Sequence, residues 1–420
     1  MAVTTTTEPS SKPASESSSK PASENASKPA TKTALELADE RASKPATNPG
    51  PNLLGRPIDS HFLVRIPVLL ILTLLIQSFS FTSTRNIPTT FLANLAQSTA
   101  ATFAIQTAVA VPSILLQNEK LYDLSGTGNF VVVIAMSLAR TARLNQGPGS
   151  EVGVVDVLGA ITRILKGEGI YNGGVWEELG VDWRQGWVTA LVYVWAVRLG
   201  LYTFIRSICR GGDSRFDKFR DNPRKFFAVF MAQGIWVTLC TVPVVAVNSI
   251  LADGFPSSDW RTSSPAAAFI RAVWFTLGLW SFLRGFAIEC LADWQLSKWL
   301  LDRHWKKHEE VFCGKGLWDR CRHPNYYGEC LVWLGISMCS AAVLMSSAAQ
   351  KSTRLGFFTV WILCSLTPYF VYKLLRNISI PVIEEKMDWK YMEIKEYRIW
   401  RRDRTLRIWL DGAGIIYGCA

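Results

Sequence analysis

The ten residues at 320–329, Arg-Cys-Arg-His-Pro-Asn-Tyr-Tyr-Gly-Glu, combine cations, an amide and a carboxyl group at the edge of an apolar stretch. Pro324 suits the first turn of a helix, where its missing N–H is not needed, so the pattern predicts a helix that begins there. In that helix Asn325, Glu329 and Trp333 follow one another at intervals of four on one face. An ionisable group one turn inside an apolar span is costly, so Glu329 is the candidate catalytic residue.

Three cationic side chains, those of Arg320, Arg322 and His323, stand just before this predicted helix. Guanidinium groups and the first backbone N–H groups of a helix together favour a phosphate group. The structural alternative is a basic anchor at the end of a membrane span, with a Glu–Arg pair, and the pattern alone leaves both open. The protonation state of Glu329 is also open, because the helix N-terminus favours its anion whereas burial favours its neutral acid.

Two other segments add polar side chains that could join such a site. Glu289 and Asp293 are four residues apart on a helix that we expect to run from the sixth apolar stretch to Val311. In the tail, Tyr397 and Arg401 fall at helical spacing, which is typical of an amphipathic surface helix or of a lid over an anionic ligand. No GxGxxG or GxxxxGK[ST] motif is present, so a dinucleotide would have to be held by Arg and Tyr side chains.

The elements that position these residues are membrane spans. Of the 420 residues 49% are hydrophobic and 19% charged, and several stretches of about 20 residues are nearly free of charge. The sequence therefore excludes a set of soluble domains and predicts an all-α polytopic transmembrane helical bundle with seven or eight spans. The predicted spans are 62–81, 91–116, 129–144, 187–206, 226–247, 266–288, 326–346 and 355–375.

Basic residues set the expected orientation. The segments 206–225 and 289–325 hold seven Lys and Arg each, and the segment 373–411 holds ten. With eight spans these three segments and the N-terminus lie on one side of the membrane, which the positive-inside rule assigns to the cytosol.

The net charge of +11 arises after residue 60, between hydrophobic spans. This placement favours contact with membrane phosphates or an anionic cofactor over binding to nucleic acid. The nine Cys residues form no CxxC pair, and no His/Cys spacing is typical of a metal site. We therefore predict neither a metal nor a disulfide framework.

Three segments outside the spans complete the predicted organisation. Residues 1–56 repeat Ser-Lys-Pro-Ala and lack apolar content, which predicts a disordered tail before a membrane domain at 57–411 and a short end at 412–420. Within the long connection 145–186, the part 150–166 has apolar residues at 154, 155, 158, 161 and 165, the spacing of one helical face. That helix either lies flat on the membrane or packs over the bundle.

The run at 317–329, Leu-Trp-Asp-Arg-Cys-Arg-His-Pro-Asn-Tyr-Tyr-Gly-Glu, closely resembles membrane enzymes similar to steroid 5-alpha-reductase. More specifically, it resembles the poorly characterised branch of that family that ends in a steroid-reductase-type C-terminal domain. The resemblance covers about 119–405, with a core at 187–405. Its other matching segments are 122–126, 195–200, 213–216, 289–295 and 380–397.

This resemblance implies a bundle of seven or eight helices in the endoplasmic reticulum, with both termini in the cytosol. It implies NADPH as cofactor and a lipophilic small-molecule substrate that enters from the bilayer. By position, Glu329 would contact the substrate carbonyl. The expected cofactor contacts are Asn325 and Tyr326, with Asp293, Arg320, Arg322 and Tyr397 as further candidates. His323 is a candidate as well, because it stands beside the arginines that could bind a phosphate.

The expected function is thus NADPH-dependent reduction of a carbon–carbon double bond in a lipid or steroid-like enone, with Glu329 polarising the carbonyl oxygen. One alternative is an S-adenosylmethionine-dependent isoprenylcysteine-type carboxyl methyltransferase, a family with a similar Arg-His-Pro-x-Tyr-x-Gly run and a Glu-Glu tail. The other is a non-catalytic sterol- or lipid-binding membrane protein.

Overall fold

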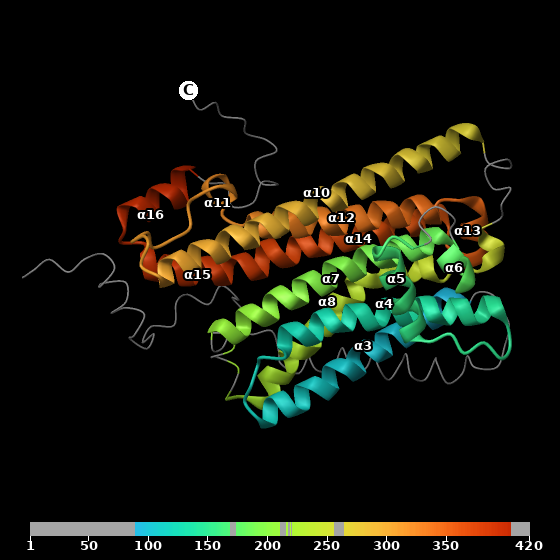
Figure 1. Cartoon of the computed structure of the whole chain (residues 1–420), viewed down its shortest axis with the longest axis horizontal. Coiled ribbons are helices and arrows are strands. Elements are labelled where there is room, and N and C mark those ends of the chain that lie inside the picture. Colours follow the sequence, from blue (N-terminus) through green and yellow to red (C-terminus); the bar gives the residue numbers. More distant parts are fainter. Residues whose placement is uncertain are drawn as a thin grey trace, which may run out of the picture. The chain divides into compact units, whose positions relative to one another are not determined.

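A computed structural model describes residues 89–168, 174–210, 216, 219, 221–255 and 264–404 (Figure 1). All of these belong to the larger of two compact units of the chain, 45–420. The predicted tail 1–56, the first predicted span at 62–81 and the end 412–420 lie outside the described residues.

Seven helices in the described part of the chain are long and apolar enough to cross a membrane. The described part contains no strand. Both findings confirm the predicted all-α polytopic bundle, and the seven helices overlap the last seven predicted spans. They are α3 Thr89–Leu115, α4 Tyr122–Gln146, α7 Trp183–Arg210, α8 Pro223–Asn248, α10 Pro265–His304, α12 Pro324–Leu344 and α14 Phe357–Leu374.

The connections carry short helices. The last span continues from α14 through a π-helical turn into α15, so that one helical rod runs from Phe357 to Tyr391. The remaining elements are α5 Val154–Leu165, α6 Gly174–Glu178, η1 Ala252–Gly254, α11 Leu317–Arg320, α13 Ser347–Thr353, η2 Leu375–Ser379, α15 Ile380–Tyr391, α16 Lys395–Ile399 and η3 Trp400–Arg404.

One of the predicted helix ends is wrong for an identifiable reason. The helix expected to reach Val311 ends at His304, where Trp305 caps it and Lys306 adopts a left-handed backbone conformation with φ 54°. The tail segment that holds Tyr397 and Arg401 is helical, from α16 into η3, and is separate from α15, which ends at Tyr391. The predicted start of α12 at Pro324 is confirmed.

Helix α5 resolves the alternatives for the connection 145–186. It buries Val157, Ala160, Ile161 and Ile164 in a cluster shared with α4. It therefore packs over the bundle, but on a face rotated from the predicted one. Val155, which the sequence pattern placed on the apolar face, is 80% exposed.

The α10–α12 pair is the closest helix pair and aligns the site. The two helices run antiparallel, and glycines seven residues apart on each meet at two levels. A Cβ added at Gly285 would lie 2.6 Å from the Gly328 carbonyl oxygen, and one at Gly335 would lie 2.5 Å from the Gly278 carbonyl oxygen. Small residues of this kind allow membrane helices to bring their backbones into contact. Helix α12 packs against α10, α14 and α8 (Figure 1).

Aromatic side chains meet in the interior where α4, α7, α8 and α12 converge. Phe130 packs edge-on against Trp195 and Trp236, and its ring centroid lies 5.4 Å from that of Trp333. Trp195 and Trp333 are fully buried. This aromatic centre lies directly beside the charged residues of α7 and α10.

Candidate functional site

A buried cation on α7 bridges two acids on α10. One Nη of Arg198 donates to Glu289 Oε1 at 2.7 Å and the other donates to Asp293 Oδ2 at 2.6 Å. Trp195 Nε1 donates to the second oxygen of Glu289 at 3.2 Å. The side chains of the two acids are 3% and 5% exposed, and that of Arg198 is 17% exposed. These short charge-assisted bonds fix the positions of both carboxylates.

Helical spacing explains why these side chains meet. Glu289 and Asp293 are four residues apart and Trp195 and Arg198 are three apart, so each pair projects from one face of its helix. Helix α7 supplies the donors and helix α10 supplies the acceptors.

Glu329 on α12 joins this group without forming an ion pair. It is 9% exposed and interacts electrostatically with Asp293 and Arg198, but no hydrogen bond joins it to another described residue. Its neighbour Gly328 explains the proximity, since a Cβ there would lie 2.8 Å from the backbone nitrogen of Glu289. One guanidinium group therefore faces three carboxyl groups within the bundle, an arrangement we call the acid cluster.

Asn325 and Tyr326 lie one turn before Glu329, toward the start of α12. Asn325 Oδ1 is buried and has no hydrogen-bond partner among the described residues. Tyr326 is partly buried against the aromatic centre, and its ring stacks on that of His323 at a centroid distance of 5.7 Å. A buried acceptor without a donor is uncommon in folded proteins and suits a donor supplied from outside the chain.

A second network lies at the C-terminal end of the chain, around Glu384 of α15. Arg322 Nε donates to Glu384 Oε1 at 2.8 Å, and His323 Nε2 lies 3.1 Å from the same oxygen. Arg401 donates to Glu384 Oε2 at 3.1 Å. Arg322 also donates to the backbone carbonyl of Arg401 at 2.9 Å. We call this group, with Asp388, the tail network.

The tail network holds α16 and η3 against α15. Arg401 donates two hydrogen bonds of 3.0 Å to Asp388, and Tyr397 Oη donates to the same carboxylate at 2.7 Å. Trp400 Nε1 donates to the carbonyl of Trp318 at 3.0 Å. Burial, with the hydrogen bond to Asp388, raises the pKa of Tyr397 above its ordinary range. Arg401 and Tyr397 are therefore engaged by carboxylates of the chain.

The sequence-predicted site residues fall into two separate groups. Asp293 and Glu329 lie in the acid cluster, with Asn325 one turn away. Arg322, His323 and Tyr397 belong to the tail network. Tyr326 lies between the groups, because it follows Asn325 on α12 and its ring stacks on that of His323. Arg320 is exposed on α11 and belongs to neither group.

The sequence analysis did not assign a role to Arg198, the cation at the centre of the acid cluster. A signal was present, because Arg198 lies within an apolar span and a buried cation there requires a counter-charge. Asp388 was also missed. It is one turn after Glu384, but nothing in the sequence shows that the chain folds back to place Arg401 beside both.

Comparison with known proteins gives one match. The model of a family described as a protein of unknown function, DUF1295, matches residues 144–404, more than half of the chain. The matched segment contains every residue of the acid cluster and the tail network. No curated protein and no solved structure matches the chain.

Proposed function

The chain belongs to the DUF1295 family, and we propose that it is an NADPH-dependent reductase of a carbon–carbon double bond in a lipid or steroid-like enone within the membrane. We also propose that it is related to steroid 5-alpha-reductase-like enzymes, on the basis of the run at 317–329. Its proposed location is the membrane of the endoplasmic reticulum.

The acid cluster is the observation that supports this proposal most directly. Arg198 is held by Glu289 and Asp293, and Glu329 makes no ion pair among the described residues. An ionised carboxylate without a partner is costly in an apolar interior, so the proposal assigns Glu329 the neutral form. A neutral carboxyl group can donate its proton in a hydrogen bond to a carbonyl oxygen, where negative charge develops when an enone accepts hydride.

The residues beside Glu329 fit the nicotinamide end of the cofactor. Asn325 Oδ1 is a buried acceptor without a donor, and the carboxamide of a nicotinamide offers an N–H group. Tyr326 would cover the same end. Arg322 and His323 would contact the phosphates in competition with Glu384, and Tyr397 would do so only in place of its bond to Asp388. NADPH, when bound, supplies the hydride.

Each residue of the acid cluster then has a defined task. The carboxyl group of Glu329 orients the carbonyl oxygen and stabilises the charge that forms on it while the β-carbon accepts hydride. A proton taken up at the α-carbon restores the carbonyl and completes the reduction. Arg198 acts as a positioning residue, because it fixes Glu289 and Asp293 on the wall of the site.

The test uses the purified protein in detergent with two cofactors. We expect NADPH to bind and S-adenosylmethionine not to bind, and we expect NADPH oxidation with at least one member of a panel of enone lipids and 3-oxo-Δ4 steroids. Glu329→Leu should lower kcat by roughly 100-fold or more, the effect of removing one donor to a developing oxyanion. Glu385→Gln, at an exposed carboxylate of α15, is the control and should retain full activity.

Three results would contradict the proposal. Binding of S-adenosylmethionine in place of NADPH would indicate a methyltransferase. Sterol binding without any nucleotide binding would indicate a non-catalytic lipid-binding protein. Turnover by Glu329→Leu within tenfold of the parent would remove Glu329 from the mechanism.

A further inference from the structure

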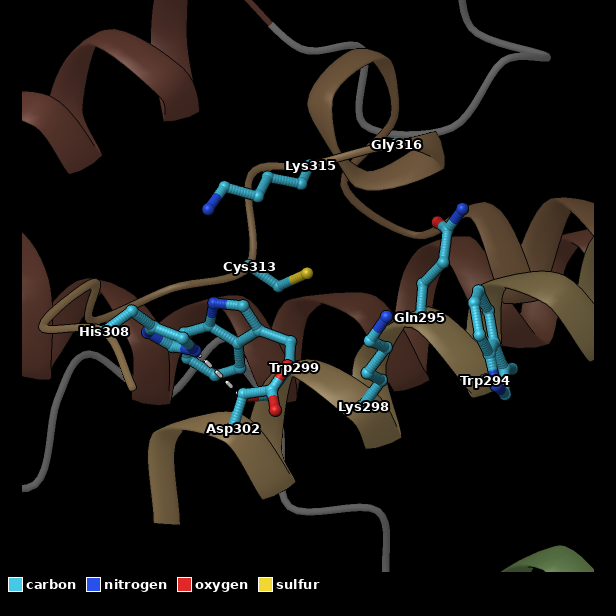
Figure 2. Close-up of a pocket in the computed structure, with 9 residues that line it drawn as sticks. All are labelled: Trp294, Gln295, Lys298, Trp299, Asp302, His308, Cys313, Lys315 and Gly316. Carbon is cyan, nitrogen blue, oxygen red and sulfur yellow. Dashed lines mark hydrogen bonds between the residues drawn. The ribbon is translucent and has the colours of Figure 1, made fainter. Parts of the chain in front are cut away.

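A pocket of about 260 Å³ lies between the last turns of α10 and the connection that follows it (Figure 2). Trp294, Lys298 and Trp299 line it from α10, and Cys313 and Lys315 line it from the connection. Figure 2 shows the two lysines on opposite walls. None of these residues belongs to the acid cluster or the tail network.

The pocket opens on the face of α10 that points away from the acid cluster. Lys298 follows Glu289 by nine residues, and nine residues turn the side-chain direction of a helix by about half a turn. Glu289 is buried against α7, whereas Lys298 is exposed. The pocket is therefore distinct from the proposed reductase site.

Its walls are held in a fixed arrangement. The backbone nitrogen of Leu317 donates to Gln295 Oε1 at 3.0 Å. Gly316 has φ +64°, and a Cβ there would lie 2.6 Å from Gln295 Nε2, so only glycine allows this approach. His308 closes the other end, with its Nε2 3.1 Å from the carbonyl of Trp299 and its ring 5.2 Å from the Trp299 ring.

Lys298 supplies the available positive charge. Its Nζ lies 5.4 Å from the centre of the Trp294 ring, and no carboxylate of the described residues forms an ion pair with it. Asp302, which also lines the pocket, accepts from Lys307 at 2.9 Å, and the nearby Glu310 pairs with Lys315 at 2.7 Å. An anion in the pocket would therefore meet the ammonium group of Lys298, which has no ion-pair partner among the described residues, and that of Lys315, whose partner Glu310 is exposed.

An apolar strip on α10 leads to this pocket. Leu283, Leu291 and Trp294 are exposed. Their helical spacing places all three on the face of α10 that carries Lys298. Trp280 and Leu277 extend the exposed strip toward the other end of α10. Such a surface is typical of a helix that faces acyl chains, and Trp294, which is 58% exposed, is suited to the boundary with the headgroups.

We propose that the pocket binds the phosphate group of an anionic membrane phospholipid, whose acyl chains lie along the exposed strip of α10. The basic side chains would contact the phosphate group, and the adjacent apolar surface of α10 would contact the acyl chains. A phosphate in the pocket could also come from a nucleotide, so the experiment separates the two sources.

The test measures lipid and nucleotide binding on the full chain. Purified protein in detergent is titrated with phosphatidic acid, with phosphatidylcholine and, separately, with NADPH, and bound molecules are counted by native mass spectrometry. The test variant is Lys298→Gln with Lys315→Gln. The control is Lys351→Gln, an exposed lysine on α13, which lies beyond the opposite end of α12.

We expect the double variant to bind phosphatidic acid at least tenfold more weakly, with no change in its binding of phosphatidylcholine or NADPH. The control should bind all three like the parent. Unchanged affinity for phosphatidic acid in the double variant would overturn the proposal. So would a loss confined to NADPH, because the phosphate would then be that of the nucleotide. If the unsubstituted protein binds no NADPH, that result contradicts the proposed reductase function, but the comparison of phosphatidic acid binding still tests the lipid proposal.

Discussion

At the residue scale, the main feature is the imbalance of charge in the acid cluster. Arg198 forms ion pairs with two buried carboxyl groups at once, and removing one partner of a buried ion pair leaves an uncompensated charge. At the protein surface, an arginine with two carboxylate partners contributes little to stability, because water screens the charges. Arg163 allows the comparison, because it also contacts two carboxylates, with its side chain 45% exposed.

We expect Arg198→Gln to destabilise the protein by about 3–5 kcal/mol, the cost of breaking a buried pair. Arg163→Gln should change the stability far less, because water screens its exposed ion pairs. Thermal and denaturant unfolding in detergent would measure both changes.

A charge-balanced variant separates electrostatics from lost packing. Glu289→Gln combined with Arg198→Gln should recover part of the stability that Arg198→Gln loses, because it removes one uncompensated carboxylate. Equal losses in Arg198→Gln and Arg163→Gln would contradict this account of the cluster.

Tyr397 predicts a dependence of stability on alkaline pH. Its folded-state pKa is raised by burial and by its bond to Asp388, so its contribution is fully present below the ordinary tyrosine pKa of about 10. As the pH rises above that value, the unfolded chain loses the proton first and the stabilisation declines. Tyr397→Phe should have a shallower decline above pH 10, measured as the midpoint of unfolding against pH. Tyr369→Phe, at an exposed ring of α14, is the control.

At the scale of the elements, substitution of Gly by Ala should have opposite effects on stability at the α10–α12 contact and on the exposed surface of α5. Gly285→Ala should destabilise the bundle by about 1–3 kcal/mol, because the new Cβ would lie 2.6 Å from the Gly328 carbonyl oxygen. Gly159→Ala on α5 meets no atom within 4 Å and should stabilise by about 0.5–1 kcal/mol. The measurement is again unfolding in detergent. A Gly285→Ala variant that is as stable as the parent or more stable would show that the helix contact is looser than the structure indicates.

Elements were predictable where one physical signal decides them. Length and apolar content located the last seven spans, and Pro324 fixed the start of α12. Predictions failed where packing decides instead. The buried face of α5 depends on its contact with α4, and the end of α10 depends on a left-handed residue, Lys306, that no spacing rule indicates.

Single residues of the candidate site were predictable from the sequence, but the networks that they form were not. Glu329 was identifiable because an acid inside an apolar span is unusual by itself. The division of the cations between two networks was not, since it depends on how the chain after α15 folds back. A sequence shows that Arg322 is basic, but only the fold shows that Glu384 accepts its hydrogen bond.

At the scale of the whole molecule, the described spans fix which connections share a side. The connection between α10 and α12 and the segment after α15 lie on one side, and the connection between α8 and α10 lies on the other. Because the first two are strongly basic, we expect them in the cytosol. A glycosylation site inserted between α8 and α10 should be modified in microsomes, and one inserted between α10 and α11 should not. The reverse pattern would invert the predicted orientation.

The backbone contact between α10 and α12 has a consequence for how a lipid reaches Glu329. Two helices that touch at the levels of both Gly278 and Gly285 cannot separate at one level without strain at the other. They therefore move together as a fixed wall. In the proposed reaction, a lipid substrate that enters from the bilayer would therefore have to pass along a seam of the bundle other than the one between α10 and α12.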